Sequence, residues 1–134
     1  VIGKYFKLKN IPISKNHKSI TLRTVFKLLS INEYIGITPD GPRGPKELAS
    51  EGIIKIAKTS KIPIIPCGFW SSKNIQLKSW DSFLVTLPFA KCFFVWNNPI
   101  YIPKNIKESE IIQYKTLLKK MIDDSVNKAK KKFE

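Results

Sequence analysis

Hydrophobic residues recur at helical spacing in three segments of the chain. In residues 18–30 they fall on one helical face, while lysine and arginine take much of the other. In residues 51–60 the same spacing follows Ser50, which can cap the first turn, and three residues are predicted to face inward: Ile53, Ile54 and Ala57. The clearest pattern covers residues 109–131, with these inward positions: Ile111, Tyr114, Leu118, Met121, Ile122, Ser125, Val126 and Ala129. The sequence therefore predicts three amphipathic helices.

Short β-rich runs lie between these helices. Residues 33–38 carry β-branched side chains and stop at Pro39, and residues 61–70 form an apolar run with prolines at its margins, which is typical of a buried parallel strand. Because a predicted helix separates the two runs, they predict a right-handed βαβ crossover. Shorter strands are predicted at residues 75–77, 91–96 and 100–102, with a helical turn near Trp80. The expected fold is α/β, a single domain over residues 1–134 with a central, mostly parallel sheet flanked by helices.

The formal net charge of +14 favours partners that are rich in phosphate, such as nucleic acid, anionic lipid headgroups or acidic carrier molecules. Lysine supplies nearly all of this charge, since Arg23 and Arg43 are the only arginines. Abundant lysine, isoleucine and asparagine are also typical of A/T-rich genomes. The charge alone therefore does not choose among these partners.

Cys67 and Cys92 are the only cysteines, and each lies beside bulky apolar residues. Two such residues make neither a disulfide framework nor a metal site, so we predict no bound metal and a reducing compartment. No apolar run approaches the roughly 18 residues of a membrane-spanning helix, and the first residues lack the layout of a signal peptide. Because the sequence begins with Val1 rather than methionine, we expect an upstream part to be missing.

One segment combines a carboxylate, a guanidinium and tight turns, namely Pro39-Asp-Gly-Pro-Arg-Gly-Pro45. It follows the predicted strand at residues 33–38, and ligands of open α/β sheets usually bind at the carboxyl ends of strands. A guanidinium binds phosphate oxygens bidentately, so we predict a phosphate site made by these residues: Asp40, Gly41, Pro42, Arg43 and Gly44. The alternative is a rigid loop in which Asp40 caps its own turn and Arg43 pairs with a surface carboxylate.

Several motifs follow this segment in a fixed order over residues 32–103. A helix comes next, then Ile-Pro-Ile-Ile-Pro at residues 62–66, Leu-Lys-Ser-Trp-Asp at residues 77–81, Pro-Phe at residues 88–89, and a strand that ends in Asn-Pro-Ile. This order resembles the lysophospholipid acyltransferase superfamily, of the glycerol-phosphate acyltransferase type. The nearest branch is a bacterial one known as a domain of unknown function.

The resemblance assigns roles to the loop. The third motif of the superfamily is usually Pro-Glu-Gly-Thr-Arg, whose acidic residue, glycine and arginine serve the phosphate site of the acceptor. Asp40, Gly41 and Arg43 stand at those places, with aspartate for glutamate and Pro42 for threonine. The fourth motif, an apolar strand closed by proline, is matched by residues 62–66.

The resemblance implies the C-terminal portion of an acyltransferase domain. Its reaction would move a fatty acyl group from an acyl-CoA or acyl-carrier-protein thioester, a co-substrate rather than a cofactor, to the hydroxyl of a lysophospholipid-type acceptor. The implied location is cytoplasmic, peripheral at the inner face of the cytoplasmic membrane. The implied partners are the anionic membrane surface, the acceptor and the thioester donor, with no specific nucleic acid.

The catalytic signature of the superfamily, His-x4-Asp, is not found in this sequence. The only histidine is His17, and the position five residues later is Leu22. In the superfamily this histidine deprotonates the acceptor hydroxyl. We therefore assign no catalytic residue to this chain and expect the chain alone to be inactive.

Two alternatives remain at this stage. A non-catalytic basic module that binds nucleic acid or anionic membrane would explain the charge, but it leaves the ordered motifs unexplained and lacks the arginine pattern of RNA readers. A degenerate and inactive acyltransferase relative is the other. Seven aromatic residues are predicted to be mostly core, or else to line an acyl-chain groove or meet a membrane interface: Phe69, Trp70, Phe83, Phe89, Phe93, Phe94 and Trp96.

Overall fold

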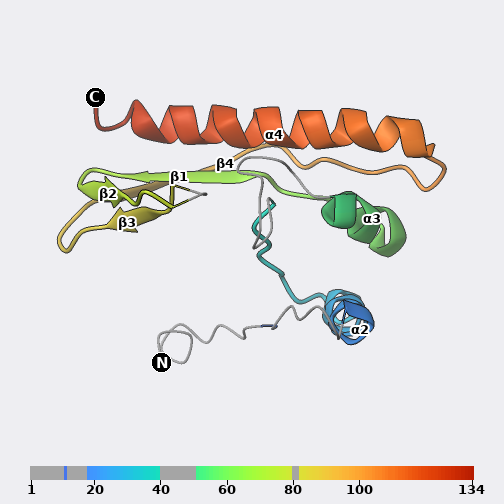
Figure 1. Cartoon of the computed structure of the whole chain (residues 1–134). Coiled ribbons are helices and arrows are strands. Elements are labelled where there is room, and N and C mark those ends of the chain that lie inside the picture. Colours follow the sequence, from blue (N-terminus) through green and yellow to red (C-terminus); the bar gives the residue numbers. More distant parts are fainter. Residues whose placement is uncertain (1–10, 12–17, 40–50, 80–81) are drawn as a thin grey trace. The chain divides into compact units, whose positions relative to one another are not determined.

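The computed structural model describes residues 11, 18–39, 51–79 and 82–134 (Figure 1). The chain divides into two compact units, Val1–Gly36 and Ile37–Glu134. The predicted turn near Trp80 and the predicted cap at Ser50 lie outside the described residues.

The first unit contains helix α2 (Lys18–Ser30), which confirms the helix predicted from the amphipathic pattern. Val25 is buried on its apolar face. The helix ends where Asn32 takes a left-handed backbone conformation with φ 59°, which asparagine tolerates better than most residues. The amide of Asn32 donates a hydrogen bond to the carbonyl of Leu29 at 3.2 Å, which satisfies one of the last helical carbonyls.

The segment after α2 is not a strand. Residues 33–38 are described, yet they pair with no other strand among the described residues, and Tyr34 is 98% exposed. A strand needs a partner for its backbone groups, and the β-branched residues Ile35 and Ile37 do not supply one. The predicted strand at this position was wrong.

The first helix among the described residues of the second unit is α3 (Glu51–Ser60). Its buried residues are the three that the sequence predicted: Ile53, Ile54 and Ala57. Lys61 ends the helix with φ 61°, and its amide donates to the carbonyl of Ala57 at 2.9 Å.

The chain after α3 forms an antiparallel pair. Strand β1 (Cys67–Ser71) pairs with β4 (Cys92–Trp96), with Phe69 opposite Phe94. Before β1 an isolated antiparallel bridge joins Ile64 to Ile100. The described residues therefore contain no parallel sheet, and the predicted α/β fold with a central parallel sheet and a βαβ crossover was wrong.

The parallel sheet was predicted wrongly because β1 pairs with a different segment from the one expected. An apolar strand of this length can pair in either direction, and β1 meets β4 because the chain reverses between them. The segment that would have been its parallel neighbour, residues 33–38, forms no ladder.

The reversal between β1 and β4 carries a second hairpin. Strand β2 (Asn74–Gln76) pairs with β3 (Leu84–Thr86) in antiparallel register. Strands were predicted at residues 75–77 and 91–96, and β2 and β4 confirm both of them within one residue. Residues 100–102 contribute the single bridge at Ile100 rather than a strand.

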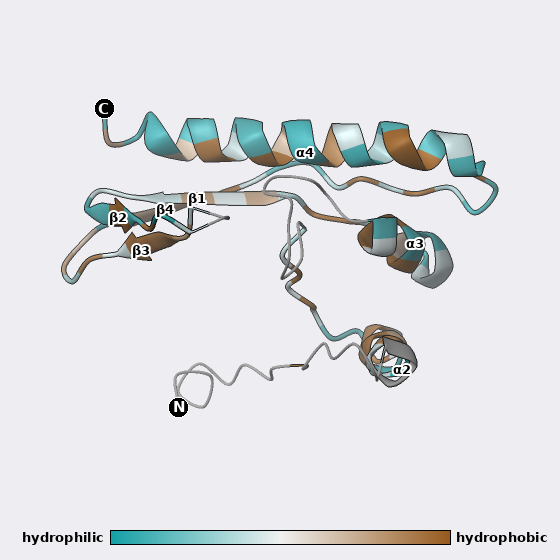
Figure 2. Ribbon diagram, viewed as in Figure 1, coloured by the Kyte–Doolittle hydropathy of each residue, from teal (hydrophilic) through white to brown (hydrophobic). Residues whose placement is uncertain are grey.

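Helix α4 (Glu108–Lys130) covers β1 and confirms the longest predicted helix (Figure 1). Its N-terminus is held by the carboxylate of Glu110, which accepts a hydrogen bond from the Lys107 amide at 2.6 Å. Its apolar stripe faces the sheet and α3, as the hydropathy colouring in Figure 2 shows. The buried cluster joins α3, the segment before α4, and α4 itself: Ile53, Ile54, Ala57, Ile100, Ile102, Ile106, Ile111 and Leu118.

Candidate functional site

The predicted phosphate loop falls in residues 40–50, so Asp40, Gly41, Pro42, Arg43 and Gly44 lie outside the described residues. His17 also lies outside them. The structure describes the two flanks of the loop, Pro39 on one side and the start of α3 at Glu51 on the other. Any role of the loop therefore remains a prediction from its residue types.

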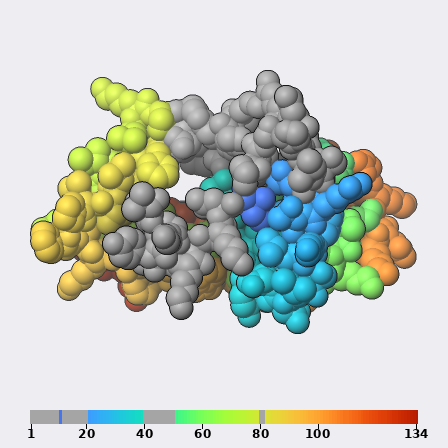
Figure 3. Space-filling model, turned by 90° about the horizontal axis from the view of Figure 1, so that it is seen from below, coloured from blue at the N-terminus to red at the C-terminus, as the bar shows by residue number. Residues whose placement is uncertain are grey.

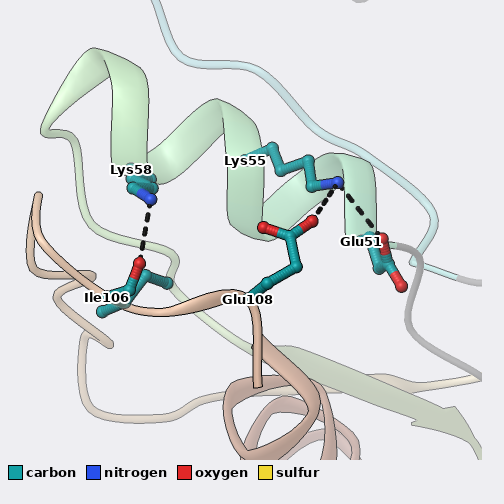
Figure 4. A network of polar contacts seen from close by, with 5 residues as sticks. All are labelled: Glu51, Lys55, Lys58, Ile106 and Glu108. Carbon is teal, nitrogen blue, oxygen red and sulfur yellow. Dashed lines mark hydrogen bonds and ion pairs between the residues drawn. The ribbon is translucent and has the colours of Figure 1, made fainter. Parts of the chain in front are cut away.

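The first turn of α3 carries an ion-pair network (Figure 4). The Lys55 ammonium lies 3.3 Å from a Glu51 carboxylate oxygen, one helical turn away, and 3.1 Å from Glu108 at the start of α4. Glu108 and, to a smaller extent, Glu51 raise the pKa of Lys55 above its ordinary value by accepting its hydrogen bonds. Because these side chains are at least half exposed, the network contributes orientation between α3 and α4 more than stability.

A second lysine of α3 makes a contact to the backbone. The Lys58 ammonium donates a hydrogen bond to the carbonyl of Ile106 at 3.1 Å (Figure 4). The aliphatic stem of Lys58 is half-buried, and Ile106 belongs to the core. This contact joins the last turns of α3 to the loop that leads into α4.

Two further lysines come together at the C-terminal end of α3. The Lys61 side chain lowers the pKa of Lys104, through a side-chain interaction first and through repulsion between the two charges second. Both side chains are exposed. Two neighbouring ammonium groups create a positive electrostatic potential, and a bound anion would reduce the repulsion between them. The described residues hold no cluster of histidine, cysteine or acidic residues that could bind a metal ion.

The structure brings together two of the segments that carry the resemblance. The amides of Ile64 and Ile100 each donate to the carbonyl of the other, at 3.0 and 2.8 Å, and the Asn97 amide donates to the Pro66 carbonyl at 2.9 Å. Residues 62–66 and residues 98–100 thus run side by side, directly beside α3 and its buried cluster.

Most of the aromatic residues that were predicted to be core are exposed. On the face of the β1–β4 pair that carries Phe69, that ring stacks on Phe94 at 5.5 Å between centroids, and Trp96 is more than half exposed. Phe83 and Phe89 are exposed on or beside the second hairpin. The prediction of a mainly buried set was wrong, because two short two-stranded sheets and one covering helix bury only part of the sheet surface.

The lysines at the end of α4 have aromatic neighbours. The Lys130 ammonium lies 4.3 Å from the centre of the Trp70 ring, and that of Lys132 lies 5.6 Å from the Phe93 ring. Trp70 and Phe93 face each other across the β1–β4 pair. Two lysines at the end of α4 thus lie over aromatic rings of the sheet.

Strand β3, the second strand of this hairpin, is the feature that sequence reasoning missed. Between the strand predicted at residues 75–77 and the one predicted at residues 91–96, no strand was predicted, although Val85 and Leu87 alternate with the polar Thr86. Alternation of this kind is the signal of a strand with one apolar face. The presence of two apolar residues in succession, Phe83 and Leu84, obscured it.

Helix α4 is long enough to cross a bilayer, but its sequence is strongly charged. Among the helices of the described residues, none combines the length and the apolar character that a membrane crossing requires.

Comparison with known proteins gives one informative relationship. An uncharacterized protein of Rickettsia prowazekii (strain Madrid E) is 29% identical to this chain over 100 residues. The matched region covers 75% of this chain and 46% of that protein, so the chain spans about half the length of the curated relative that it matches. No family model matches the chain, and no solved structure matches it.

Proposed function

We propose that this chain is the acceptor-binding part of an acyltransferase. The enzyme would move a fatty acyl group from an acyl-CoA or acyl-carrier-protein thioester to the hydroxyl of a lysophospholipid-type acceptor, as a peripheral protein at the inner face of the cytoplasmic membrane. The order of motifs from Asp40 to Ile100 carries the proposal, because no single one of them is specific.

Three observations support the proposal. The segment that contains Arg43 comes before α3 in the sequence, and α3 belongs to the buried cluster. The segments at residues 62–66 and 98–100, which carry two of the motifs, are hydrogen-bonded to each other beside that cluster. The relative is about twice as long as its matched region, which leaves room in a protein of that length for a general base that this sequence lacks.

The chemistry assigns binding rather than catalysis to this chain. In the transfer, the acceptor oxygen bonds to the thioester carbonyl carbon, the carbon–sulfur bond breaks, and the proton of the hydroxyl passes through a base to the departing thiol. The Arg43 guanidinium would bind the acceptor phosphate with two parallel hydrogen bonds. Asp40 would orient Arg43, and Gly41 and Gly44 would let backbone amides approach the phosphate.

The test is a kinetic comparison in the full-length protein. With a lysophospholipid acceptor and an acyl thioester donor, Arg43→Ala should lower kcat/KM for the acceptor roughly 10- to 100-fold, as expected for the loss of hydrogen bonds to a charged group. The kcat/KM of Arg43→Lys should lie between those of the wild-type protein and Arg43→Ala, because lysine keeps the positive charge but loses the fork geometry of the guanidinium. Arg23→Ala is the matched control, since Arg23 is the other arginine and is exposed on α2.

Two results would overturn the proposal. Equal kcat/KM values for the Arg43 variants and the wild-type protein would remove Arg43 from the acceptor site. Absence of acyl transfer by the full-length protein, together with tight and steeply salt-dependent binding of nucleic acid, would favour the non-catalytic basic module instead.

A further inference from the structure

The hairpin of β2 and β3 carries an apolar face whose composition follows from its register. Ile75 lies opposite Val85. The pairing continues on both sides, because the Leu77 amide donates to the Phe83 carbonyl at 3.0 Å and the Leu87 amide donates to the Lys73 carbonyl at 3.0 Å. Since side chains alternate across a strand, one face holds all of the odd-numbered positions. We call this the hairpin face: Lys73, Ile75, Leu77, Phe83, Val85 and Leu87.

The opposite face of the hairpin is bound to β1. The Asn74 side-chain amide donates to the Ser71 carbonyl at 2.7 Å, and the Thr86 hydroxyl donates to the Ser71 hydroxyl at 3.2 Å. Ser71 is 1% exposed. These contacts hold Asn74 and Thr86 on the side of the hairpin that meets Ser71, and the odd-numbered positions lie on its other side.

The hairpin face is apolar and open. The exposed fractions are 58% for Phe83, 53% for Ile75 and 46% for Leu77. Figure 2 colours β3 largely brown, the colour of hydrophobic residues, and Figure 3 shows the yellow-green and yellow hairpin at the molecular surface. Neighbouring large apolar side chains on one exposed face mark an interaction site more often than scattered single ones do.

A further exposed apolar residue, Phe89, lies in the turn that follows β3. Its side chain is 100% exposed and its backbone has φ 61°, a left-handed conformation that is unfavourable for a bulky residue. The Ala90 amide donates to the Leu87 carbonyl at 3.2 Å, which closes the turn around Phe89. Glycine or asparagine would make the same turn more easily. Folding therefore does not explain why an aromatic residue stands at this position. Insertion of the ring into a lipid phase would explain it.

Lysines flank the apolar residues along the chain. Lys73, Lys78 and Lys91 are exposed, and the only acidic residue between positions 72 and 91 is Asp81. Aromatic and aliphatic side chains bordered by lysine are the composition of surfaces that insert shallowly at a membrane interface. Each lysine near an anionic surface adds attraction to the lipid headgroups.

We propose that the hairpin face, together with Phe89, docks on an anionic lipid bilayer and inserts its apolar side chains between the headgroups. A second copy of the chain is the less favourable occupant, because each copy carries a net charge of +14 and like charges would face one another. An anionic bilayer supplies both the apolar phase and the opposite charge.

This inference specifies how the membrane association in the proposed function would be achieved, but it does not need acyl transfer. The test below measures binding alone. Failure of the kinetic test on Arg43 would leave hairpin docking intact, and failure of docking would leave the role of Arg43 intact.

The experiment measures partition of the intact protein onto vesicles of phosphatidylcholine with about one-third phosphatidylglycerol, by co-sedimentation. The variant Phe89→Asn keeps a residue that tolerates the left-handed turn, so it should fold normally and bind about tenfold more weakly. Leu77→Asn should also weaken binding to the vesicles. Tyr101→Ser is the matched control, because Tyr101 is an exposed aromatic residue outside the hairpin, and its partition should equal that of the wild type.

A second measurement reports insertion directly. In Phe89→Trp the added fluorescence should be quenched by brominated acyl chains in anionic vesicles. Normal binding by the Phe89 and Leu77 variants would overturn the proposal, as would an unquenched tryptophan at position 89. A concentration-dependent dimer that Phe89→Asn abolishes, without any vesicle binding by the wild type, would also overturn it and assign the surface to a second copy.

Discussion

The backbone of Gly68 in β1 lies directly against that of Val126 in α4. A methyl group placed on Gly68 would lie 2.5 Å from the Val126 amide nitrogen and 2.8 Å from the Ser125 carbonyl carbon. Both are backbone atoms of a long helix, so neither can move away like the end of a flexible side chain. The absence of a side chain at position 68 thus sets the distance between the helix and the sheet.

Gly68→Ala is therefore expected to destabilise the second unit by about 1–3 kcal/mol or more, the range for overpacking a well-packed contact. Chemical denaturation monitored by circular dichroism would measure the loss. Gly36→Ala is the matched control, because a methyl group there would have no neighbour within 4 Å. Equal midpoints for the two variants would contradict the close approach of α4 to β1.

Leu118 provides a second test of the packing of α4. It is 2% exposed and belongs to the buried cluster, whereas its neighbour Leu117 is 42% exposed. Leu118→Ala should destabilise the unit by about 2–5 kcal/mol, through lost burial and the cavity that remains. Leu117→Ala should change the free energy of unfolding by roughly 0.5 kcal/mol or less. A similar loss for both variants would show that α4 does not present this face to the core.

The helices could be predicted because their signal is local. Ile111, Leu118 and Ser125 lie on one side of α4 through helical spacing alone, and the structure buries all three. The same holds for Ile53, Ile54 and Ala57 in α3.

Strand partners could not be predicted, because pairing depends on residues far apart in the sequence. The apolar run before Trp70 has the composition of a parallel strand, yet Phe69 pairs with Phe94 on an antiparallel neighbour. Direction is set by where the chain returns, and nothing in residues 61–70 encodes it.

The candidate site also has a part that could be predicted from the sequence and a part that could not. Residue chemistry singled out Arg43 and Asp40, since a guanidinium beside a glycine-rich turn suits phosphate wherever it stands. The lysine interactions at α3 depend on folding: Lys58 donates to the Ile106 carbonyl 48 positions away, and Lys61 lowers the pKa of Lys104. No periodicity or spacing in the sequence predicts these long-range interactions.

The two cysteines should differ in reactivity. Burial raises the pKa of the Cys67 thiol, and its sulfur lies 3.7 Å from the Gly68 carbonyl oxygen, whereas Cys92 is exposed. Because the thiolate is the nucleophile, iodoacetamide at mildly alkaline pH should alkylate Cys92 first and Cys67 more slowly. Mass spectrometry of the peptides would measure both rates.

One control and one pH dependence complete this experiment. In urea the rates should converge, because unfolding removes the burial of Cys67. Because burial disfavours the thiolate, the fold should also lose stability as the pH rises from the ordinary thiol pKa of 9.0 through the higher folded value. Faster alkylation of Cys67 than of Cys92 in the native protein would contradict the burial of this thiol.

The paired ammonium groups of Lys61 and Lys104 should oppose folding at neutral pH. The folded pKa of Lys104 is lower than its ordinary value of 10.5, so the unfolded chain binds more protons between the two values, and stability should rise with pH across that window. Lys104→Gln removes the repulsion and should raise the urea midpoint at pH 7. The gain should shrink as the pH rises through the folded pKa of Lys104, and added salt should screen it because both groups are exposed. Lys128→Gln, near the other end of α4, is the control and should leave the pH dependence unchanged. A lower urea midpoint for Lys104→Gln at neutral pH would contradict this prediction and would mean that Lys104 stabilises the fold through another contact. If inorganic phosphate then raised the midpoint of the wild type but not that of Lys104→Gln, that contact would be a bound anion.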